Sequence, residues 1–275
     1  MLAAGLATRL KVGALVLGLA ATTLCACVGT PTPTPTREPV LHLAYTSEVE
    51  SIVVELLQSS PFAVKGQECS WDSCLALASS GYADAALIWG PEPPVGPQLA
   101  VEPWAADALA IIVNPRNQVG PLEREALRGI FSGRVQDWAP FGQGLGAIQV
   151  MTRERGSGPR ELLSRLVMAG EPLSGNARVA ASDDAVLDYV ASEPAAIGYV
   201  SAASLREGVR ALTVEGMRPE PQKVRDGLYS LMAGIWLVYR PESIAEELRS
   251  LLSSDAGQEV LSRYFAAPEL AFVRP

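Results

Sequence analysis

The chain has a single histidine, His42, among its 275 residues. A Ser-His-Asp catalytic set or a mixed Cys/His zinc site needs an imidazole beside the other members, and His42 stands in an apolar run that predicts a strand at residues 41–45. The acidic pairs Asp183-Asp184 and Glu246-Glu247 are typical of a helix start and of a solvent-facing helix surface. We therefore expect no enzymatic activity, no metal site and no cofactor.

Basic residues are also in short supply. The chain has 22 Lys and Arg residues against 30 Asp and Glu residues, a formal net charge of −8. This balance argues against nucleic acid as a partner. The negative net charge does not exclude binding of a small anion, because local backbone amides and one arginine can outweigh a diffuse negative field over a few ångströms.

The apolar run near the N-terminus, residues 12–24, is too short to span a bilayer and follows the basic residues Arg9 and Lys11. This pattern predicts a secretory signal peptide over residues 1–26. The ending L-C-A-C resembles a bacterial lipobox, which implies cleavage before Cys27 and lipidation of its thiol. A plain signal peptide and an uncleaved anchor remain the alternatives.

The next segment alternates proline and threonine (G-T-P-T-P-T-P-T-R-E-P, residues 29–39). Such a composition cannot build a core and favours an extended, semi-rigid chain, so residues 27–39 are expected to form a tether. Residues 40–275 would then be held outside the cytoplasm by a lipid anchor, at the cell surface or on the periplasmic side. Loss of the signal removes two basic residues, leaving 20 against 30 acidic ones and a net charge of −10.

Only four cysteines are present. Cys25 would leave with the signal and Cys27 would carry lipid, so Cys69 and Cys74 remain in a compartment where disulfides persist. A bridge across so short a loop stabilises by roughly 2 kcal/mol in the loop-entropy estimate. A structural disulfide is favoured over two free thiols.

Along residues 40–275, short β-rich runs alternate with helical patterns, which predicts an α/β architecture with mainly parallel sheets. The stretch 90–103 has five prolines and is expected to be an irregular connection. The expected strands are residues 41–45, 85–89, 109–114, 148–152, 196–200 and 234–239. The expected helices are residues 48–58, 73–80, 121–131, 159–168, 182–192 and 241–264, the last with a possible break at Gly257.

Residues 151–163, M-T-R-E-R-G-S-G-P-R-E-L-L, have the features of an anion socket. A helix start offers unpaired N–H groups and partial positive charge, and glycines allow close approach to the main chain. Ser157 adds a hydroxyl, Gly158 a close backbone amide, and Arg153 a two-pronged guanidinium. The alternative is an ordinary serine-capped helix with solvated arginines.

Four segments between residues 107 and 231 share a further pattern. They are D-A-L-A-I-I-V-N with L-E-R-E-A-L-R-G-I-F-S-G-R-V-Q-D-W (107–114 and 122–138), R-E-R-G-S-G (153–158), A-A-I-G-Y-V (195–200) and D-G-L-Y-S-L (226–231). In these segments and their order, the chain from residue 107 onward resembles the phosphate-type substrate-binding proteins of ABC transporters, members of the type II periplasmic-binding-protein superfamily.

The resemblance implies two α/β lobes joined by two crossover segments and closing on a ligand between them. Lobe one would comprise residues 40–108 and 217–275, and lobe two residues 109–216. It also implies a monomer that delivers a small inorganic anion, with phosphate the first expectation, to ABC permease subunits.

The resemblance gives the socket residues Arg153, Ser157 and Gly158 the task of holding a tetrahedral oxyanion. Thr46 and Ser47 stand where lobe one of the family offers hydroxyls and amides, although simple helix capping explains them equally well. Ser73, together with Ser70, is a weaker candidate in the turn before the next helix.

Three positions depart from the family's pattern. Pro159 replaces a threonine and removes a hydroxyl and an amide donor. Trp71 and Asp72 replace a small turn, and Gly90-Pro91-Glu92 stands where an aspartate accepts the proton of hydrogen phosphate. Glu92 or Asp72 would have to replace that acceptor. Each departure would weaken phosphate binding by about 1 to 3 kcal/mol. Three alternatives therefore stay open: another oxyanion, a small organic acid, and a sensor or interaction lipoprotein with altered or lost ligand binding.

Overall fold

The computed structural model describes residues 40–241 and 245–266. The predicted signal peptide, the tether and the lipidation site Cys27 lie outside these residues. Among the described residues, no helix has both the length and the apolar character needed to cross a bilayer.

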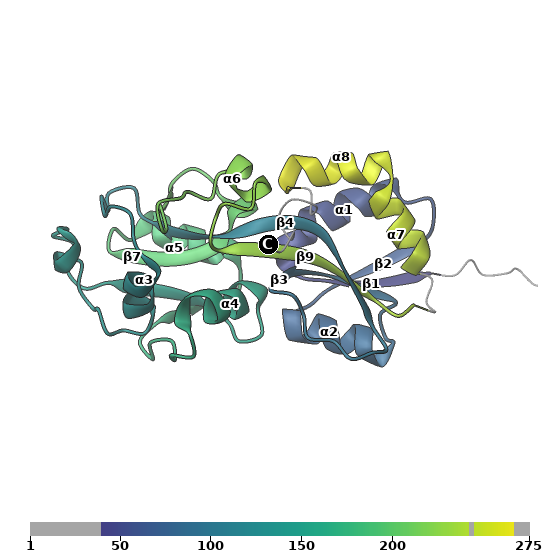
Figure 1. The fold of residues 1–275 in the computed structure, drawn as a ribbon, viewed down its shortest axis with the longest axis horizontal. Coiled ribbons are helices and arrows are strands. Elements are labelled where there is room, and N and C mark those ends of the chain that lie inside the picture. Colours follow the sequence, from purple (N-terminus) through teal and green to yellow (C-terminus); the bar gives the residue numbers. More distant parts are fainter. Residues whose placement is uncertain (1–39, 242–244, 267–275) are drawn as a thin grey trace, which may run out of the picture. The chain divides into compact units, whose positions relative to one another are not determined.

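A single mixed sheet organises the fold, with strand order β2-β1-β3-β9-β4-β7-β5-β6 and β8 beside β4 (Figure 1). Pairing is parallel in β2-β1-β3 and in β7-β5-β6, as expected, whereas β9 and β4 pair antiparallel with their neighbours. The strands are β1 Leu41–Tyr45, β2 Val64–Glu68, β3 Ala85–Gly90, β4 Ala100–Val113, β5 Gln149–Arg153, β6 Arg178–Ala180, β7 Ala196–Ser201, β8 Arg210–Ala211 and β9 Met232–Tyr239.

The long strand β4 joins two lobes. Its residues from Ala100 to Ala108 pair with β9, and those from Leu109 to Val113 pair with β7. The chain crosses from one lobe to the other along β4 and returns along β9, which accounts for the two expected crossover segments. We use first lobe for the part built on β1 to β3 and second lobe for the part built on β5 to β7. The residue limits given above for the lobes stay a prediction.

In the first lobe, helices cover both faces of the sheet (Figure 1). Because successive side chains of a strand point to opposite faces, Leu43 and Leu87 join the core beneath α1, α7 and α8, while Ala44 and Ile88 pack with α2 on the other face. The helices are α1 Glu50–Ser59, preceded by the short 3-10 turn η1 Ser47–Val49, α2 Trp71–Ser80, α7 Ala245–Ser253 and α8 Asp255–Tyr264.

The second lobe follows the same rule. Ile111 and Val113 of β4 belong to the core with α3 and α4, and Ala110 and Ile112 pack against α5. The helices are α3 Arg124–Phe131, α4 Gly158–Leu163, which continues as a π-helical segment Ser164–Met168, and α5 Asp183–Ser192. Burial on both faces explains why these strand sequences are apolar throughout rather than alternating.

Several boundaries differ from expectation. Helix α3 begins at Arg124 rather than Pro121, and the break near the C-terminus is at Ser254, whose hydroxyl caps α8 by accepting from the amide of Gly257. Strand β4 begins at Ala100, inside the expected irregular connection. The strand tolerates Pro103 because this residue lies at a shift in the pairing register with β9, where no backbone N–H donor is needed. The polar edge strand β2, the short strands β6 and β8, and helix α6 Pro221–Arg225 lack the apolar period that would have predicted them.

Candidate anion-binding site

A cavity of about 190 Å³ lies where the first and second lobes meet. Thr46 and Ser47 of the first lobe and Arg153, Ser157 and Gly158 of the second lobe all line this cavity. The lining residues are Thr46, Ser47, Glu48, Glu68, Cys69, Ser70, Trp71, Arg153, Glu154, Ser157, Gly158 and Ala181.

Three helix N-termini converge on this cavity. The strands β1, β2 and β5 each end just before a helix or 3-10 turn, and the first residues of those helices are Ser47, Trp71 and Gly158. First-turn amides have no partner inside their own helix and carry partial positive charge. A cavity at the carboxyl ends of strands in an α/β fold is therefore suited to a small anion.

The residue before each of these helices has a hydroxyl. Ser70 caps α2 by accepting from the amide of Ser73, at 3.4 Å. Thr46 and Ser157 make no side-chain capping bond. The Thr46 hydroxyl accepts from the Trp89 amide at 3.1 Å, and both Thr46 and Ser157 are buried. Ser70 thus caps its helix, and the side-chain capping given as the alternative for Thr46 and for Ser157 is not observed.

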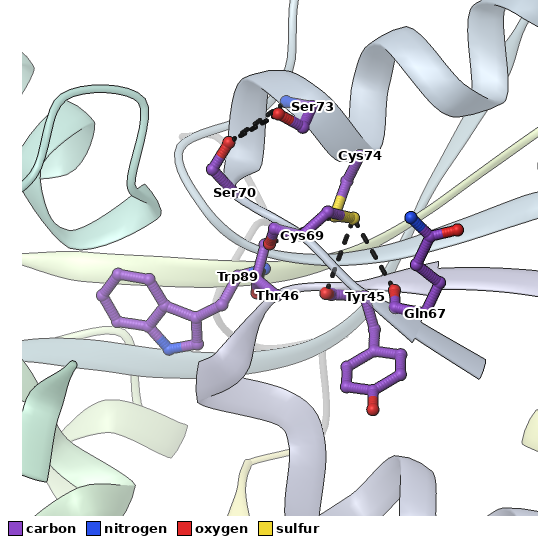
Figure 2. Close-up of a disulfide and its surroundings, with 8 residues drawn as sticks. All are labelled: Tyr45, Thr46, Gln67, Cys69, Ser70, Ser73, Cys74 and Trp89. Carbon is purple, nitrogen blue, oxygen red and sulfur yellow. Dashed lines mark hydrogen bonds between the residues drawn. A yellow bond between two sulfur atoms is a disulfide. The ribbon is translucent and has the colours of Figure 1, made fainter. Parts of the chain in front are cut away.

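Ser73 does not belong to this cavity. Its hydroxyl lies 2.8 Å from that of Ser70, which does line the cavity, and Figure 2 shows the two side chains together at the start of α2. A ligand contact of Ser73 stays a prediction.

Cys69 and Cys74 form the expected disulfide (Figure 2). The bridge ties the residue after β2 to the first turn of α2. Both Cys69 and the start of α2 border the cavity, so the disulfide holds one of its walls.

Arg153 is the centre of a buried charge cluster rather than an open clamp. Its side chain is 1% exposed, and all five N–H donors have acceptors in the protein. Nη1 donates to Glu48 at 3.1 Å and to Asp183, Nε and Nη2 each donate to Glu154 at 3.1 Å, and Nη2 also reaches the carbonyl of Ala181 at 3.4 Å. In this arrangement a ligand reaches the guanidinium only by replacing a carboxylate.

The cluster shifts the pKa values of its members. Burial, and next the charge of Glu48, raises the pKa of Asp183 to about 7 against the opposing effect of Arg153. Burial would lower the pKa of Arg153, but the hydrogen bonds with Glu154 and the charges of Asp183 and Glu48 raise it above its ordinary value. The guanidinium therefore stays charged, while burial opposes the ionisation of Asp183.

The surroundings of Arg153 are acidic overall. A neighbouring cavity of about 340 Å³ shares Ser47, Glu48 and Glu68 with the first and adds Asp183 and Asp184. Within the described part of the chain, no group of three or more His, Cys, Asp or Glu side chains is arranged to hold a metal ion. An anion at the helix N-termini would thus meet attraction from amides and repulsion from carboxylates.

Neither proposed substitute for the family aspartate lines the cavity. Glu92 and Asp72 are both exposed. The amide of Asp72 instead donates to the carbonyl of Gly156 at 3.4 Å and so joins α2 to the loop before α4. The carboxylates that do line the cavity are Glu48, Glu68 and Glu154, and Glu48, which the sequence analysis assigned to a helix, is the one from the first lobe that pairs with Arg153. Its position directly after Thr46-Ser47 was the available signal.

Comparison with known proteins gives a consistent result. A family model described as "PBP superfamily domain" matches residues 74–261. The phosphate-binding protein PstS of Bacillus subtilis is 30% identical over 131 residues, which is 47% of this chain and 43% of that protein. The chain thus matches less than half the length of this curated relative.

Two solved structures cover most of the chain. An ABC-type phosphate transport receptor from Vibrio cholerae superimposes with a TM-score of 0.73 at 25% identity, covering 83% of this chain and 100% of that one. A Clostridium perfringens protein solved with bound phosphate gives a TM-score of 0.75 at 21% identity, covering 83% and 99%, which supports the fold. These similar proteins are described as binding or transport proteins and not as enzymes.

Proposed function

The chain belongs to the PBP superfamily, and from this membership we propose that it is an extracytoplasmic solute-binding protein that captures a small oxyanion between its two lobes. Phosphate is the first candidate ligand, because similar proteins are described as phosphate-binding proteins and phosphate transport receptors. The protein would hand its ligand to the permease subunits of an ABC importer, acting as a monomer and without catalysis.

The observation that carries this proposal is the convergence of three helix N-termini on one cavity. The oxyanion accepts hydrogen bonds from the first-turn amides of Ser47 and Gly158, from the hydroxyl of Thr46, and from the hydroxyl of Ser157, which turns to it from the carbonyl of Glu154, at 2.9 Å. Arg153 supplies the positive charge, and the ligand takes the place of Glu48 on its Nη1. Pro159 supplies no amide, so the site has fewer donors than a threonine would allow.

The membrane attachment is part of the same proposal. Residues 1–26 direct export, Cys27 carries the lipid, and residues 27–39 let the two lobes reach the permease from the membrane surface. Mass spectrometry of the mature protein, showing an N-terminal diacylglyceryl-cysteine at position 27, tests this step. An unmodified or uncleaved N-terminus would refute it.

The ligand assignment is tested by calorimetry and thermal unfolding of the purified protein with phosphate, sulfate, molybdate, tungstate and small carboxylates. A ligand present at a hundred times its dissociation constant stabilises the protein by about 2.7 kcal/mol. Ser157→Ala should weaken binding, whereas Ser192→Ala, which changes an exposed serine on α5, should leave it unchanged. A protein that none of these anions stabilises would refute the proposal.

A second candidate function is a membrane-anchored sensor or interaction protein of the same fold with altered or lost ligand binding. It is favoured by the saturation of Arg153 with carboxylates and by Pro159 at the start of α4. Tight binding of a protein partner without binding of any anion in the panel would support this function. Anion-dependent uptake by a reconstituted permease would support the first.

A further inference from the structure

Trp71 differs from the other tryptophans of the chain. All five tryptophans lie in the described residues, and four donate their indole N–H to an acceptor inside the protein. The acceptors are a carboxylate oxygen of Asp107 for Trp89, at 2.7 Å, and the carbonyls of Leu252 for Trp104, Ala195 for Trp138 and Gly90 for Trp236, at 3.4, 2.8 and 3.0 Å.

The indole N–H of Trp71 has no such partner among the described residues, although the side chain is only 5% exposed. Burying a donor without an acceptor costs on the order of 1 to 3 kcal/mol, so native proteins rarely leave one unpaired. A phenylalanine would fill the same space without that cost. The unpaired N–H therefore needs an explanation that the packing of the ring does not supply.

The position of Trp71 supplies one. It is the first residue of α2 and lines the cavity at which the three helix N-termini converge. A Cβ built on Gly90 would lie 3.2 Å from Nε1 of Trp71 and 3.2 Å from the Cα of Gly158. The indole nitrogen and the first residue of α4 thus lie close together around the same glycine.

The ring is also held in place. The disulfide between Cys69 and Cys74 closes the turn on either side of Trp71. The guanidinium carbon of Arg165 lies 5.8 Å from the ring centroid, which is within cation–π range. A donor fixed in this way can bind without losing much rotamer freedom.

We propose that the indole N–H of Trp71 donates a hydrogen bond to the oxyanion bound at the start of α4. This inference rests on the proposed function and names a ligand contact that the small turn expected at this position would not provide. It gives the site a neutral donor beside Pro159, where the hydroxyl and amide of a threonine are missing. The bulky residue that replaces the family's small turn is then one of the donors to the anion.

The test combines a spectroscopic and a binding measurement on the protein labelled with ¹⁵N, using inorganic phosphate and sulfate as probes. The indole N–H signal of Trp71, assigned with Trp71→Phe, should shift on addition of the anion that binds, while the signal of Trp104 stays in place. Trp71→Phe should weaken binding about 10- to 100-fold in calorimetry without lowering the free energy of unfolding.

Trp104→Phe is the matched control. It removes an indole N–H that bonds to Leu252, outside the cavity, so it should lower stability and leave anion affinity unchanged. Anion binding by the wild type with an unmoved Trp71 signal, or with equal affinity in Trp71→Phe, would overturn the inference and leave the proposed function intact. If neither probe binds the wild type, the inference falls together with the oxyanion assignment. If Trp71→Phe does not fold, the Trp71 signal is assigned by elimination, from single Trp→Phe variants of the other four tryptophans. The titration of the wild-type protein then tests the inference.

Discussion

Gly158 begins α4 against the end of β3, where there is no space for a side chain. A Cβ at this position would lie 2.0 Å from the carbonyl oxygen of Trp89, whereas real contacts of this kind are essentially never shorter than 3.0 Å. Gly158→Ala therefore requires the start of α4 and the end of β3 to separate by at least 1.0 Å. The atom in the way belongs to the backbone, so no side-chain rotation relieves the clash.

The cost of keeping this contact in the variant is about 1 to 3 kcal/mol, the usual range for overpacking. Since each 1.4 kcal/mol is a factor of ten, the population with the two lobes in contact should fall about 5- to 100-fold relative to open forms. We expect the variant to keep both lobes folded, because the clash lies between the lobes and not inside either core.

Double electron–electron resonance between spin labels at the exposed residues Gln58 and Asn176, one on each lobe, measures the distance between the lobes directly. The distance distribution should broaden towards longer values in Gly158→Ala. Gly175→Ala is the control in the same lobe, because a Cβ there meets nothing within 4 Å. Equal distance distributions and equal unfolding free energies in the two variants would refute the reasoning.

Three further predictions follow from the charges and the disulfide. Glu48→Gln removes a negative charge from Arg153 and should raise anion affinity at least about fivefold in calorimetry; unchanged or weaker binding would contradict the displacement of Glu48. Burial raises the pKa of Asp107 from 3.8 to about 6, so the folded state binds more protons than the unfolded state in this window and stability falls as pH rises through it, by up to about 3 kcal/mol. Urea unfolding at pH 4, 5, 6 and 8 should show a smaller fall for Asp107→Asn, and an equal fall would count against the assignment. Replacing both Cys69 and Cys74 by serine should lower the unfolding free energy by about 2 kcal/mol in non-reducing buffer, and a reductant should affect only the wild type.

The elements that the sequence predicted well are those with a strong local signal. Strand β1 was expected at its observed limits, and α5, expected over residues 182–192, spans Asp183–Ser192 with Ser182 as its cap. The pairing of Cys69 with Cys74 followed from the compartment and the short loop, and the structure confirms it. Strand β2 and the first half of β4 were missed, because an exposed polar edge and a proline-rich crossing carry no apolar period.

The residues of the candidate site also divide into those that a local sequence motif indicated and those that it did not. The turn from Arg153 to Gly158 and the pair Thr46-Ser47 were found as local motifs at strand ends, and the structure places them on one cavity. Their roles as ligand contacts stay a prediction. Ser73 does not line the cavity, although its hydroxyl lies 2.8 Å from that of Ser70, which does.

The sequence by itself determined the local chemistry of this protein: strand ends followed by hydroxyl residues and helix starts, a close cysteine pair, and an acidic chain. Only the tertiary structure decided which side chains share a low-dielectric space. Glu48 and Asp183 reach Arg153 from 105 and 30 residues away, and the Trp71 N–H lies buried beside Gly158 with no partner in the part of the chain that the structure describes. The reason is physical, since burial and pairing depend on how β4 and β9 bring the two lobes together, and no local pattern records that distance.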